Sequence, residues 1–490
     1  MTKPLFSLAY PAGCKSLSLS KLQRKKILAE PEKLFGQAFP HATESQLTSL
    51  RTLHHEYLAE KKELRDIQAQ RKKLSRQIGE AKCNNQPTEQ LINSMQELGH
   101  TSNYLSTKLS ELSDKLLACF ETGNRDENPT EKPSLPRARV HIETVADDDH
   151  ISIISLSDEF EPWNAYIDSN PAASLYHRAE WKDLIQKVFG HECCYLYASQ
   201  KGEFAGVLPL VRLKSYLFGD FMVSMPYFNY GGAIANSLFI EQRLMHAASD
   251  LARSKGVAHI EYRDDIARDS LPVRSDKVNM ILPLPESEAQ LWNSFPSKLR
   301  SQVRRAQRET VQVKCGSAEC LNDFYTVFAQ NMRDLGTPVY GRALFENILQ
   351  IFPGSCQIIN VYHSGRPVAA AFLLGYKESL EIPWASTIKD VNHLSINMLL
   401  YWEVLKFAIK NRYRYFDFGR SSMDSGTYRF KQQWGAIPKQ SYWHYWLPDN
   451  VDMPKLNPEN PRFLLAISIW KKLPVFLTKI LGPCIVKSLP

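Results

Sequence analysis

Apolar residues in the N-terminal quarter of the chain recur at alternating steps of four and three, the spacing of a coiled-coil seam. The downstream positions are Leu91, Met95, Leu98, Leu105, Leu109, Leu112 and Leu116, with polar Ser102 in one slot. The upstream positions are Leu50, Leu53, Tyr57, Leu64, Ile67, Leu74 and Ile78, with Glu60 and Arg71 at weaker slots. Asn84 to Pro87 separate the two runs and break the helical pattern. The pattern predicts an antiparallel helical hairpin, a coiled coil, over residues 46–121.

The segments on either side of this hairpin lack such a pattern. Residues 1–45 form a poorly patterned leader, and its short apolar run LFSLAYPAGC is too short and too proline-interrupted for a secretion signal. Residues 122–150 follow as a linker, because the stretch up to residue 140 is rich in proline and charge. No stretch approaches the roughly 18 apolar residues of a transmembrane helix. We expect a cytoplasmic protein.

From residue 151 to 450, strand-like and helix-like patterns alternate, and one pattern occurs twice. CYLYASQKGEFAGVLPLVRL, from Cys194, matches QIINVYHSGRPVAAAFLLGY, from Gln357, as strand, glycine turn and strand. In both copies a helix follows, and then a short strand with one acid, Glu261 in HIEY and Asp417 in YFDF. The duplication predicts an α/β protein with two lobes, residues 151–290 and 291–450.

Residues 451–490 form an apolar, basic tail. Lysines interrupt its apolar run from Phe463, and Pro474 and Gly482 divide it into short helices. Two interpretations stay open. The tail lies at a membrane surface, where its lysines favour anionic lipid, or it packs back on the lobes.

Charge and cysteine content add little to this picture. The formal net charge of +8 permits anionic partners without requiring them. The nine cysteines are scattered, with no CxxC pair and no histidines at zinc-ligand spacing, so they indicate reduced thiols and predict no metal site.

The charge is concentrated near the tip of the hairpin. The segment RKKLSRQIGEAK contains one acid and five cations, of which Arg71, Lys72, Lys73 and Arg76 are the candidate nucleic-acid contacts. The hairpin resembles the N-terminal tRNA-binding arm of seryl-tRNA synthetases in length, in form and in this run. The resemblance covers about 75 residues, no synthetase catalytic motif follows, and a generic helical arm is the alternative. It implies tRNA as a partner of the arm.

The stretch YFDFGRSSMDSGTYRFKQQW, residues 415–434, gathers many polar side chains. Its aromatic, strand-like start breaks at Gly419, which predicts a strand end that opens into a loop. The candidate site residues are Asp417, Arg420, Ser421, Asp424, Thr427 and Lys431. The alternative is an ordinary strand followed by a salt-bridged turn.

Three further motifs carry candidate binding groups. Arg300, Arg304 and Arg308 fall at i, i+4 and i+8 on one helix face, which predicts either a diphosphate site or a solvated basic face. SMPYFNYGG presents three side chains for an acceptor groove or for aromatic packing between the lobes: Tyr227, Asn229 and Tyr230. His177 is a candidate donor to a phosphate or a sugar hydroxyl, or a structural histidine.

The chain from Trp163 to Pro490 resembles the FemAB-like branch of the GNAT (acyl-CoA N-acyltransferase) superfamily, in particular the members associated with exosortase and PEP-CTERM exopolysaccharide systems. The matching motifs are SLYHRAEW, GVLPL, SMPYFNYGG, KLRSQVRRAQR, DLGTP, FDFGRSSMDSGTYRFKQQWG and WKKLPVFLTKILGP. The resemblance implies two tandem GNAT-like lobes and the transfer of an aminoacyl group from tRNA to an amine of a cell-wall precursor.

Acetyl-CoA-dependent GNAT enzymes hold pyrophosphate on an R/Q-x-x-G-x-G/A loop at a helix start. The chain has no such run, and the nearest candidate, RSSMDSGTY, has one glycine and an aspartate. Amide formation needs a group that takes the proton of the amine. Asp417 is the first candidate for this role, Asp424 the second, and Lys431 completes the catalytic set. No nucleophile-elbow motif is present, so direct transfer is the simpler mechanism.

We therefore expect a FemAB-like acyl- or aminoacyltransferase that acts on an exopolysaccharide or peptidoglycan precursor, which can be lipid-linked. Its donor would be aminoacyl-tRNA or acyl-CoA, with no tightly bound cofactor. A CoA-dependent N-acyltransferase is one alternative. A non-catalytic protein that binds a glycan precursor or tRNA is another. Contact with the inner face of the membrane is a further expectation.

Overall fold

The computed structural model describes residues 151–490 apart from 159, 217, 269–270, 450, 455–460 and 490, together with helix α3 and single residues between 28 and 116. These residues belong to two units, Met1–Glu131 and Lys132–Pro490, and each is described by itself. The predicted hairpin tip at residues 84–87, the linker at 122–150 and nearly all of the leader lie outside the described residues.

The first unit contains one long helix, α3 (Glu44–Cys83). Its Leu50 and Tyr57 cluster with Leu112 and Leu116 from the downstream run. Its Glu60 forms an ion pair with Lys108. α3 therefore contacts residues of the downstream apolar run. The long helix agrees with the upstream apolar spacing, and the coiled-coil pairing stays a prediction.

The second unit contains the two predicted lobes. Lobe 2 is built on a seven-stranded sheet in the order β11-β12-β13-β14-β15-β10-β16. The strands are β11 (Val311–Gly316), β12 (Cys356–His363), β13 (Arg366–Tyr376), β14 (Ser379–Thr387), β15 (Tyr415–Ser422), β10 (Lys277–Pro283) and β16 (Ile437–Gln440). Helices α10 (Leu321–Leu335) and α11 (Arg342–Ile351) pack on one face. Helices α8 (Glu288–Ser294), α9 (Ser297–Gln307), α12 (Ile396–Lys410) and α13 (Gly426–Gln433) pack on the other.

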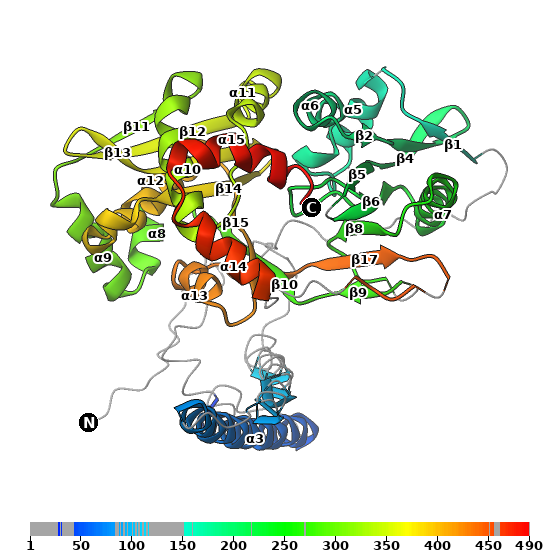
Figure 1. Ribbon diagram of the computed structural model, residues 1–490. Coiled ribbons are helices and arrows are strands. Elements are labelled where there is room, and N and C mark those ends of the chain that lie inside the picture. Colours follow the sequence, from blue (N-terminus) through cyan, green and yellow to red (C-terminus); the bar gives the residue numbers. More distant parts are fainter. Residues whose placement is uncertain are drawn as a thin grey trace, which may run out of the picture. The chain divides into compact units, whose positions relative to one another are not determined.

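Lobe 1 has two sheets, in the orders β1-β3-β4-β7 and β2-β5-β6-β8-β17-β9. Their strands are β1 (Ile151–Ser155), β2 (Glu192–Cys193), β3 (Leu196–Gln200), β4 (Glu203–Leu208), β5 (Val211–Ser215), β6 (Gly219–Val223), β7 (Ile234–Ala235), β8 (Ile260–Asp264), β9 (Val273–Arg274) and β17 (Tyr442–Trp446). Helices α5 (Phe160–Ser169) and α6 (Glu180–Phe189) pack in the same hydrophobic core as α10 and α11. Helix α7 (Leu238–Lys255) packs in a separate core. Figure 1 shows the two lobes side by side.

The internal duplication is present in the structure. The two matched sequences form the antiparallel hairpins β3–β4 and β12–β13. Each lobe also has one parallel pair joined through a helix, β6 with β8 in lobe 1 and β14 with β15 in lobe 2. The last paired residues are Val223 with Glu261 in lobe 1 and Glu381 with Asp417 in lobe 2. The two acids predicted to correspond therefore occupy equivalent positions.

Two strands, β10 and β17, belong to the sheet of the other lobe from the one that the predicted boundary at residue 290 gives them. We call them the exchanged strands. β10 precedes this boundary, yet it lies between β15 and β16 in the sheet of lobe 2. β17 follows lobe 2 in the chain, yet it pairs with β8 and β9 of lobe 1. The assignment of all residues from 151 to 290 to one lobe and from 291 to 450 to the other is wrong for these two strands. Local apolar patterns do not say which sheet receives a strand.

The C-terminal tail forms two helices, α14 (Pro461–Trp470) and α15 (Val475–Val486). Figure 1 shows both in red against lobe 2, with the end of the chain beside lobe 1. Thr478, Gly482 and Val486 are buried. A Cβ on Gly482 would lie 2.7 Å from the carbonyl oxygen of Val339, so α15 approaches the backbone of lobe 2 closely. The tail does pack back on the lobes.

Candidate functional site

The candidate site lies where the two parallel strands of lobe 2 separate. β14 and β15 pair only from Ser379–Tyr415 to Glu381–Asp417, although β14 continues to Thr387 and β15 to Ser422. Beyond Glu381 and Asp417 these two strands part, while β15 remains paired with β10 on its other side from Tyr415 to Ser422. The last paired position therefore sets two carboxylates next to each other at the start of an opening in the sheet.

A β-bulge at this position shapes β15. Asn279 of β10 pairs with Arg420 and Ile281 pairs with Asp417, so Phe418 and Gly419 together face one residue of β10. Gly419 has φ +75°, the left-handed conformation that glycine adopts without steric cost. Its amide donates a 2.7 Å hydrogen bond to Oδ1 of Asp417. The prediction that the strand ends at Gly419 is wrong, because the glycine forms a bulge and the strand continues.

Side chains of lobe 1 hold both carboxylates. Tyr176, in the short 3-10 helix Leu175–His177, donates a hydrogen bond of 2.6 Å to Oε2 of Glu381. Tyr230 donates one of 2.6 Å to Oδ2 of Asp417. The amide of Asn229 lies 3.5 Å from Oε1 of Glu381. Glu381 and Asp417 are only 8% and 6% exposed, so the site is complete only when the two lobes are together.

Burial keeps a proton on this pair. Desolvation, with the nearby charge of Asp417, raises the pKa of Glu381 to about 8. Desolvation also raises the pKa of Asp417, while the hydrogen bonds from Tyr230 and Gly419 lower it. Two adjacent carboxylates in a dry site cannot both ionise readily. At neutral pH the pair therefore holds a proton on Glu381.

Lys431 supports the bulge. This buried residue of α13 donates hydrogen bonds of 3.0 Å to the carbonyl oxygen of Gly419 and 2.9 Å to that of Arg420. Burial lowers its pKa to about 8, and the charges of Asp417 and Glu381 act in the opposite direction. The sequence placed Lys431 in the catalytic set, and its contacts are those of a positioning residue for the bulged strand.

The corresponding opening in lobe 1 is closed by its own chain. The amide of Ser224 donates to the carbonyl of Glu261 at 2.8 Å, and the amide of Gly232 donates to that of Arg263 at 3.1 Å. The guanidinium of Arg263 donates to the carbonyl oxygens of Met225 and Phe228 within this 224–232 loop. The loop reaches lobe 2 through Asn229 and Tyr230. Lobe 1 has Val223 where lobe 2 has Glu381, so it has no carboxylate pair at this position.

The loop carries backbone strain. Tyr227 and Met225 have φ of +73° and +65°, an uncommon conformation for large side chains. Strain of this kind persists only where the surroundings hold it, and it is concentrated at functional sites. The hydrogen bonds from Arg263 to the loop carbonyls keep the loop in this conformation. Arg263 also donates to Glu261 at 3.0 Å, which fixes the guanidinium itself.

Arg420 borders the site with an aromatic partner. Its guanidinium lies 4.2 Å from the centre of the Trp443 ring, and that of Arg263 lies 4.4 Å from the same ring. Cations over an indole face are attracted to its π electrons. Burial, with the nearby charge of Arg263, lowers the pKa of Arg420 to about 10, so this predicted binding residue still carries a positive charge at neutral pH.

Other predicted residues lie elsewhere. His177 is buried, and its ring nitrogens lie 3.0 Å from the Gly232 carbonyl and 2.9 Å from the Ser174 hydroxyl. The structural alternative therefore describes His177, because both ring nitrogens face protein. The hydroxyl of Tyr227 donates to the carbonyl of Lys487 at 2.8 Å, away from Asn229 and Tyr230. Its ring packs against Phe189 and Tyr340, and its place in an acceptor groove stays a prediction.

The turn after β15 is mostly exposed. Asp424 and Thr427 are both exposed, and the Thr427 hydroxyl contacts that of Ser425 at 2.9 Å. Asp424 forms no contact with the carboxylate pair in the described structure. Ser421 is different, because its hydroxyl is buried and makes no hydrogen bond to any described residue. An unpaired buried hydroxyl next to the bulge is a group that a ligand can satisfy.

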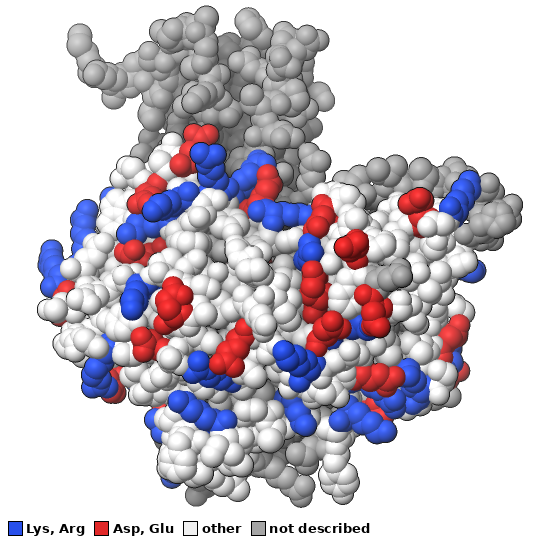
Figure 2. Space-filling model, turned by 90° about the horizontal axis from the view of Figure 1, so that it is seen from above, with Lys and Arg blue, Asp and Glu red and all other residues white. Residues whose placement is uncertain are grey.

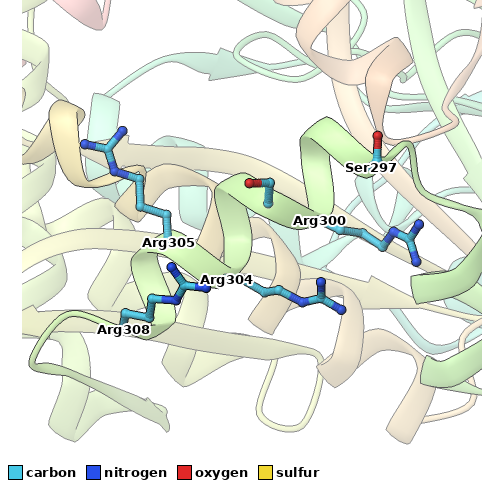
Figure 3. Close-up of a pocket in the computed structure, with 6 residues that line it drawn as sticks. Ser297, Arg300, Arg304, Arg305 and Arg308 are labelled. Carbon is cyan, nitrogen blue, oxygen red and sulfur yellow. The ribbon is translucent and has the colours of Figure 1, made fainter.

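The predicted arginine face lies on α9. A hollow of about 500 Å³ is lined by the residues shown in Figure 3: Ser297, Arg300, Ser301, Arg304, Arg305 and Arg308. Arg300 and Arg304 point to the same side of the helix (Figure 3). Arg304 lies over the Trp292 ring at 5.5 Å, and Nε of Arg300 is buried without a hydrogen-bond partner in the described structure. On the face seen in Figure 2, basic and acidic side chains are interspersed, so the net charge does not form one field there.

Sequence reasoning missed several residues of the site: Tyr176, Arg263, Glu381 and Trp443. Glu381 had a signal, since it is a single acid in the apolar run LEIPW, just as Asp417 is in YFDF. Trp443 had no signal in the sequence, because it lies on β17, which pairs with strands of lobe 1 far away in the chain. Within the described residues, no three His, Cys, Asp or Glu side chains are grouped to hold a metal ion.

Residues 293–432, most of lobe 2, match the family model of the acetyltransferase (GNAT) domain. This part of lobe 2 is therefore similar to a GNAT domain. Residues 22–122 match the N-terminal domain of seryl-tRNA synthetase, as the hairpin resemblance predicted. The α/β fold with GNAT architecture and an N-terminal helical region is thus confirmed. The match supports an acyltransferase and leaves the acyl group open.

Solved structures resemble the chain only distantly. FemX is 15% identical, with 59% of this chain and 96% of that chain covered and a TM-score of 0.47. A domain of a putative lysylphosphatidylglycerol synthetase from Agrobacterium fabrum is 11% identical, with 64% and 94% covered and a TM-score of 0.41. A tandem GNAT protein from the clavulanic acid pathway is 10% identical, with 62% and 100% covered and a TM-score of 0.37. Curated proteins gave no match.

Proposed function

We propose that the protein is a FemAB-like aminoacyltransferase that forms an amide on an amine of a cell-envelope precursor. The observation that supports this most is the Glu381–Asp417 pair at the opening of lobe 2. It lies where the two parallel strands of lobe 2 separate, and burial raises the pKa of both carboxyls. A carboxylate with a raised pKa is a suitable acceptor for the proton of an attacking amine.

The reaction is a direct transfer. The amine nitrogen attacks the ester carbonyl, a C–N bond forms, and the C–O bond to the ribose breaks. The amine proton passes to Asp417, which then donates it to the leaving ribose oxygen and returns to its starting state. Glu381, protonated at neutral pH, lowers the local negative charge so that both substrates can enter. Tyr230, Tyr176 and Lys431 hold the carboxylates and the bulge in place.

Aminoacyl-tRNA is the favoured donor for three reasons. The segment that enters α12, residues 388–395, has no glycine and carries Asp390, so it does not suit the pyrophosphate of CoA. The arm matches a domain of a tRNA synthetase. The arginines of α9 have no ion-pair partner among the described residues and can face phosphates. A CoA-dependent N-acyltransferase is the competing version of this proposal.

The acceptor is proposed from the family resemblance of the sequence. Exopolysaccharide or peptidoglycan precursors bear amines and, in their membrane-bound forms, a diphosphate. Donor and precursor would meet on the cytoplasmic side, which is why we propose a cytoplasmic location. Without catalysis, the same site would make the chain a binding protein for the precursor or for tRNA.

The test uses purified full-length protein with aminoacyl-tRNA carrying a labelled amino acid, and in parallel with labelled acetyl-CoA. Each donor is combined with amine acceptors, and amide formation is followed. We expect transfer from tRNA and none from acetyl-CoA. Transfer from acetyl-CoA alone would show that the protein is a CoA-dependent N-acyltransferase. Binding of both substrates without any product would show that it is a non-catalytic binding protein.

A further inference from the structure

The two C-terminal helices have apolar residues on both faces, and only one face is covered by protein. On α15, Thr478, Gly482 and Val486 recur every four residues and are buried. Phe476 and Ile480 recur at the same interval on another face and are 63% and 65% exposed. Leu465 and Ile469 of α14 are exposed with the same spacing, and Leu481 adds to them. We call these five exposed residues the C-terminal apolar surface.

This surface is held firmly on the protein. Arg333 donates a 3.0 Å hydrogen bond to the carbonyl of Leu473, in the turn between the two helices. Tyr227 donates to the carbonyl of Lys487 at the other end of α15. A Cβ on Gly336 would lie 2.6 Å from the Ile467 side chain, so α14 also packs closely. The exposed side chains are therefore presented by docked helices.

The charges around this surface have one sign. Residues 461–490 contain five cations and no acid, the cations being Arg462, Lys471, Lys472, Lys479 and Lys487. None of the four lysines forms an ion pair with a described residue. Lys479 lies over the Tyr325 ring at 5.4 Å, which leaves the adjacent Lys471 and Lys472 as the candidate lipid contacts. An apolar face in a segment with lysines and no acid matches the chemistry of an anionic lipid surface, where alkyl stems lie in the boundary region and ammonium groups reach the phosphates.

A second copy of the chain fits this surface poorly. A two-fold interface places the same patch against itself, so the lysines would face one another without an acid to balance them. None of the described helices is long and apolar enough to cross a bilayer.

We propose that the C-terminal apolar surface docks the protein on an anionic membrane. α14 and α15 lie in the plane of the interface, with Phe476, Ile480 and their neighbours in the headgroup–acyl boundary. Lys471 and Lys472 contact lipid phosphates. This proposal does not depend on the acyltransferase activity, because it concerns vesicles that contain no substrate.

The experiment measures sedimentation of the full-length protein with vesicles of phosphatidylcholine alone or of phosphatidylcholine mixed with phosphatidylglycerol, whose negative surface potential attracts basic segments. The variant Phe476→Ser with Ile480→Ser should bind the anionic vesicles about tenfold or more weakly, because binding scales with buried apolar area. Lys471→Gln with Lys472→Gln should remove most of the preference for anionic vesicles. Leu238→Ser, at an exposed leucine of α7 in lobe 1, is the matched control and should bind normally.

Three outcomes would overturn the proposal. These are no binding of the wild-type protein to anionic vesicles, equal binding of the wild-type protein and the Phe476/Ile480 variant, and a self-association in solution that the same variant abolishes. The last would assign the surface to an interface between copies. The thermal transition of every variant is recorded, and Phe476→Leu, which keeps the apolar character, should retain binding.

Discussion

Glu381 and Asp417 face each other at the last paired position of β14 and β15, and each accepts a hydrogen bond from a tyrosine of the other lobe. The pairing of the two strands thus brings together two buried carboxyls whose pKa values are both raised by desolvation.

Asp417→Asn should lower the turnover rate by about 10²–10⁴-fold, the usual contribution of a proton acceptor. The asparagine side chain can still accept from the Gly419 amide, so the fold should remain. Asp424→Asn removes a carboxylate from an exposed position seven residues away in the chain and should leave turnover close to wild type. Steady-state kinetics with matched circular dichroism spectra check both, and equal rates for the wild-type and Asp417 proteins would exclude Asp417 from the reaction.

Glu381→Gln should change how stability depends on pH. Burial raises the pKa of Glu381 from 4.5 to about 8, so the folded state binds this proton more tightly than the unfolded state does. Its contribution to stability is fully present below pH 4.5 and is lost as pH rises through about 8. Glutamine cannot titrate, so the variant should gain thermal stability relative to wild type between pH 5 and pH 8.

Glu378→Gln serves as the control for this effect. Glu378 is exposed at the start of β14 and pairs with Arg414 across the surface. Its variant should follow the pH dependence of the wild-type protein. Parallel melting curves of wild type and Glu381→Gln across this range would contradict the buried protonated pair.

Tyr230→Phe should shift the acid limb of the pH–rate profile toward higher pH. The hydroxyl of Tyr230 donates to Asp417 and thereby lowers the pKa of that carboxyl. Without it, the pKa of Asp417 rises, and a higher pH is needed to keep the group ionised. The profile of kcat/KM against pH measures this shift. Tyr227→Phe, which loses a contact to the Lys487 carbonyl instead, should leave the limb in place.

Arg300→Ala with Arg304→Ala should weaken binding of tRNA and reduce its salt dependence. Each lost phosphate contact lowers the slope of log affinity against log salt by about 0.7–0.9. Arg414→Ala removes a cation that is already paired with Glu378 and is the control. Filter binding at several salt concentrations measures the slopes. An unchanged slope would show that the arginines of α9 form a solvated basic face and do not contact tRNA phosphates.

The arm carries an independent prediction. Replacing Arg71, Lys72 and Lys73 with alanine should lower tRNA affinity and its salt slope, because these side chains lie along one basic segment of α3. Lys62→Ala, in the same helix, should have a small effect. If deletion of residues 46–120 leaves both quantities unchanged, the arm does not bind tRNA.

Much of the fold followed from local patterns. The apolar spacing of the arm and the repeated hairpin both express short-range periodicity, and the structure has both elements. Asp417 was found because an acid in an aromatic strand is conspicuous. Gly419 was misread, since a glycine after a strand signals a bulge as readily as an end, and only the partner strand β10 decides between them.

The rest of the site depends on contacts between distant segments. Tyr176 meets Glu381 across 205 positions of the chain. Trp443 reaches lobe 1 through an exchanged strand that no local pattern marks. His177 looked available in the sequence, and only the position of the Gly232 carbonyl shows that its ring is engaged.

The exchanged strand β17 also affects how the protein is made. β8 of lobe 1 ends at Asp264, and its partner β17 begins at Tyr442, roughly 180 residues later. At translation rates of about 5–20 residues per second, the edge of β8 stays unpaired for about 10–35 s on the ribosome. A nascent chain of this protein would therefore depend on chaperones during that interval.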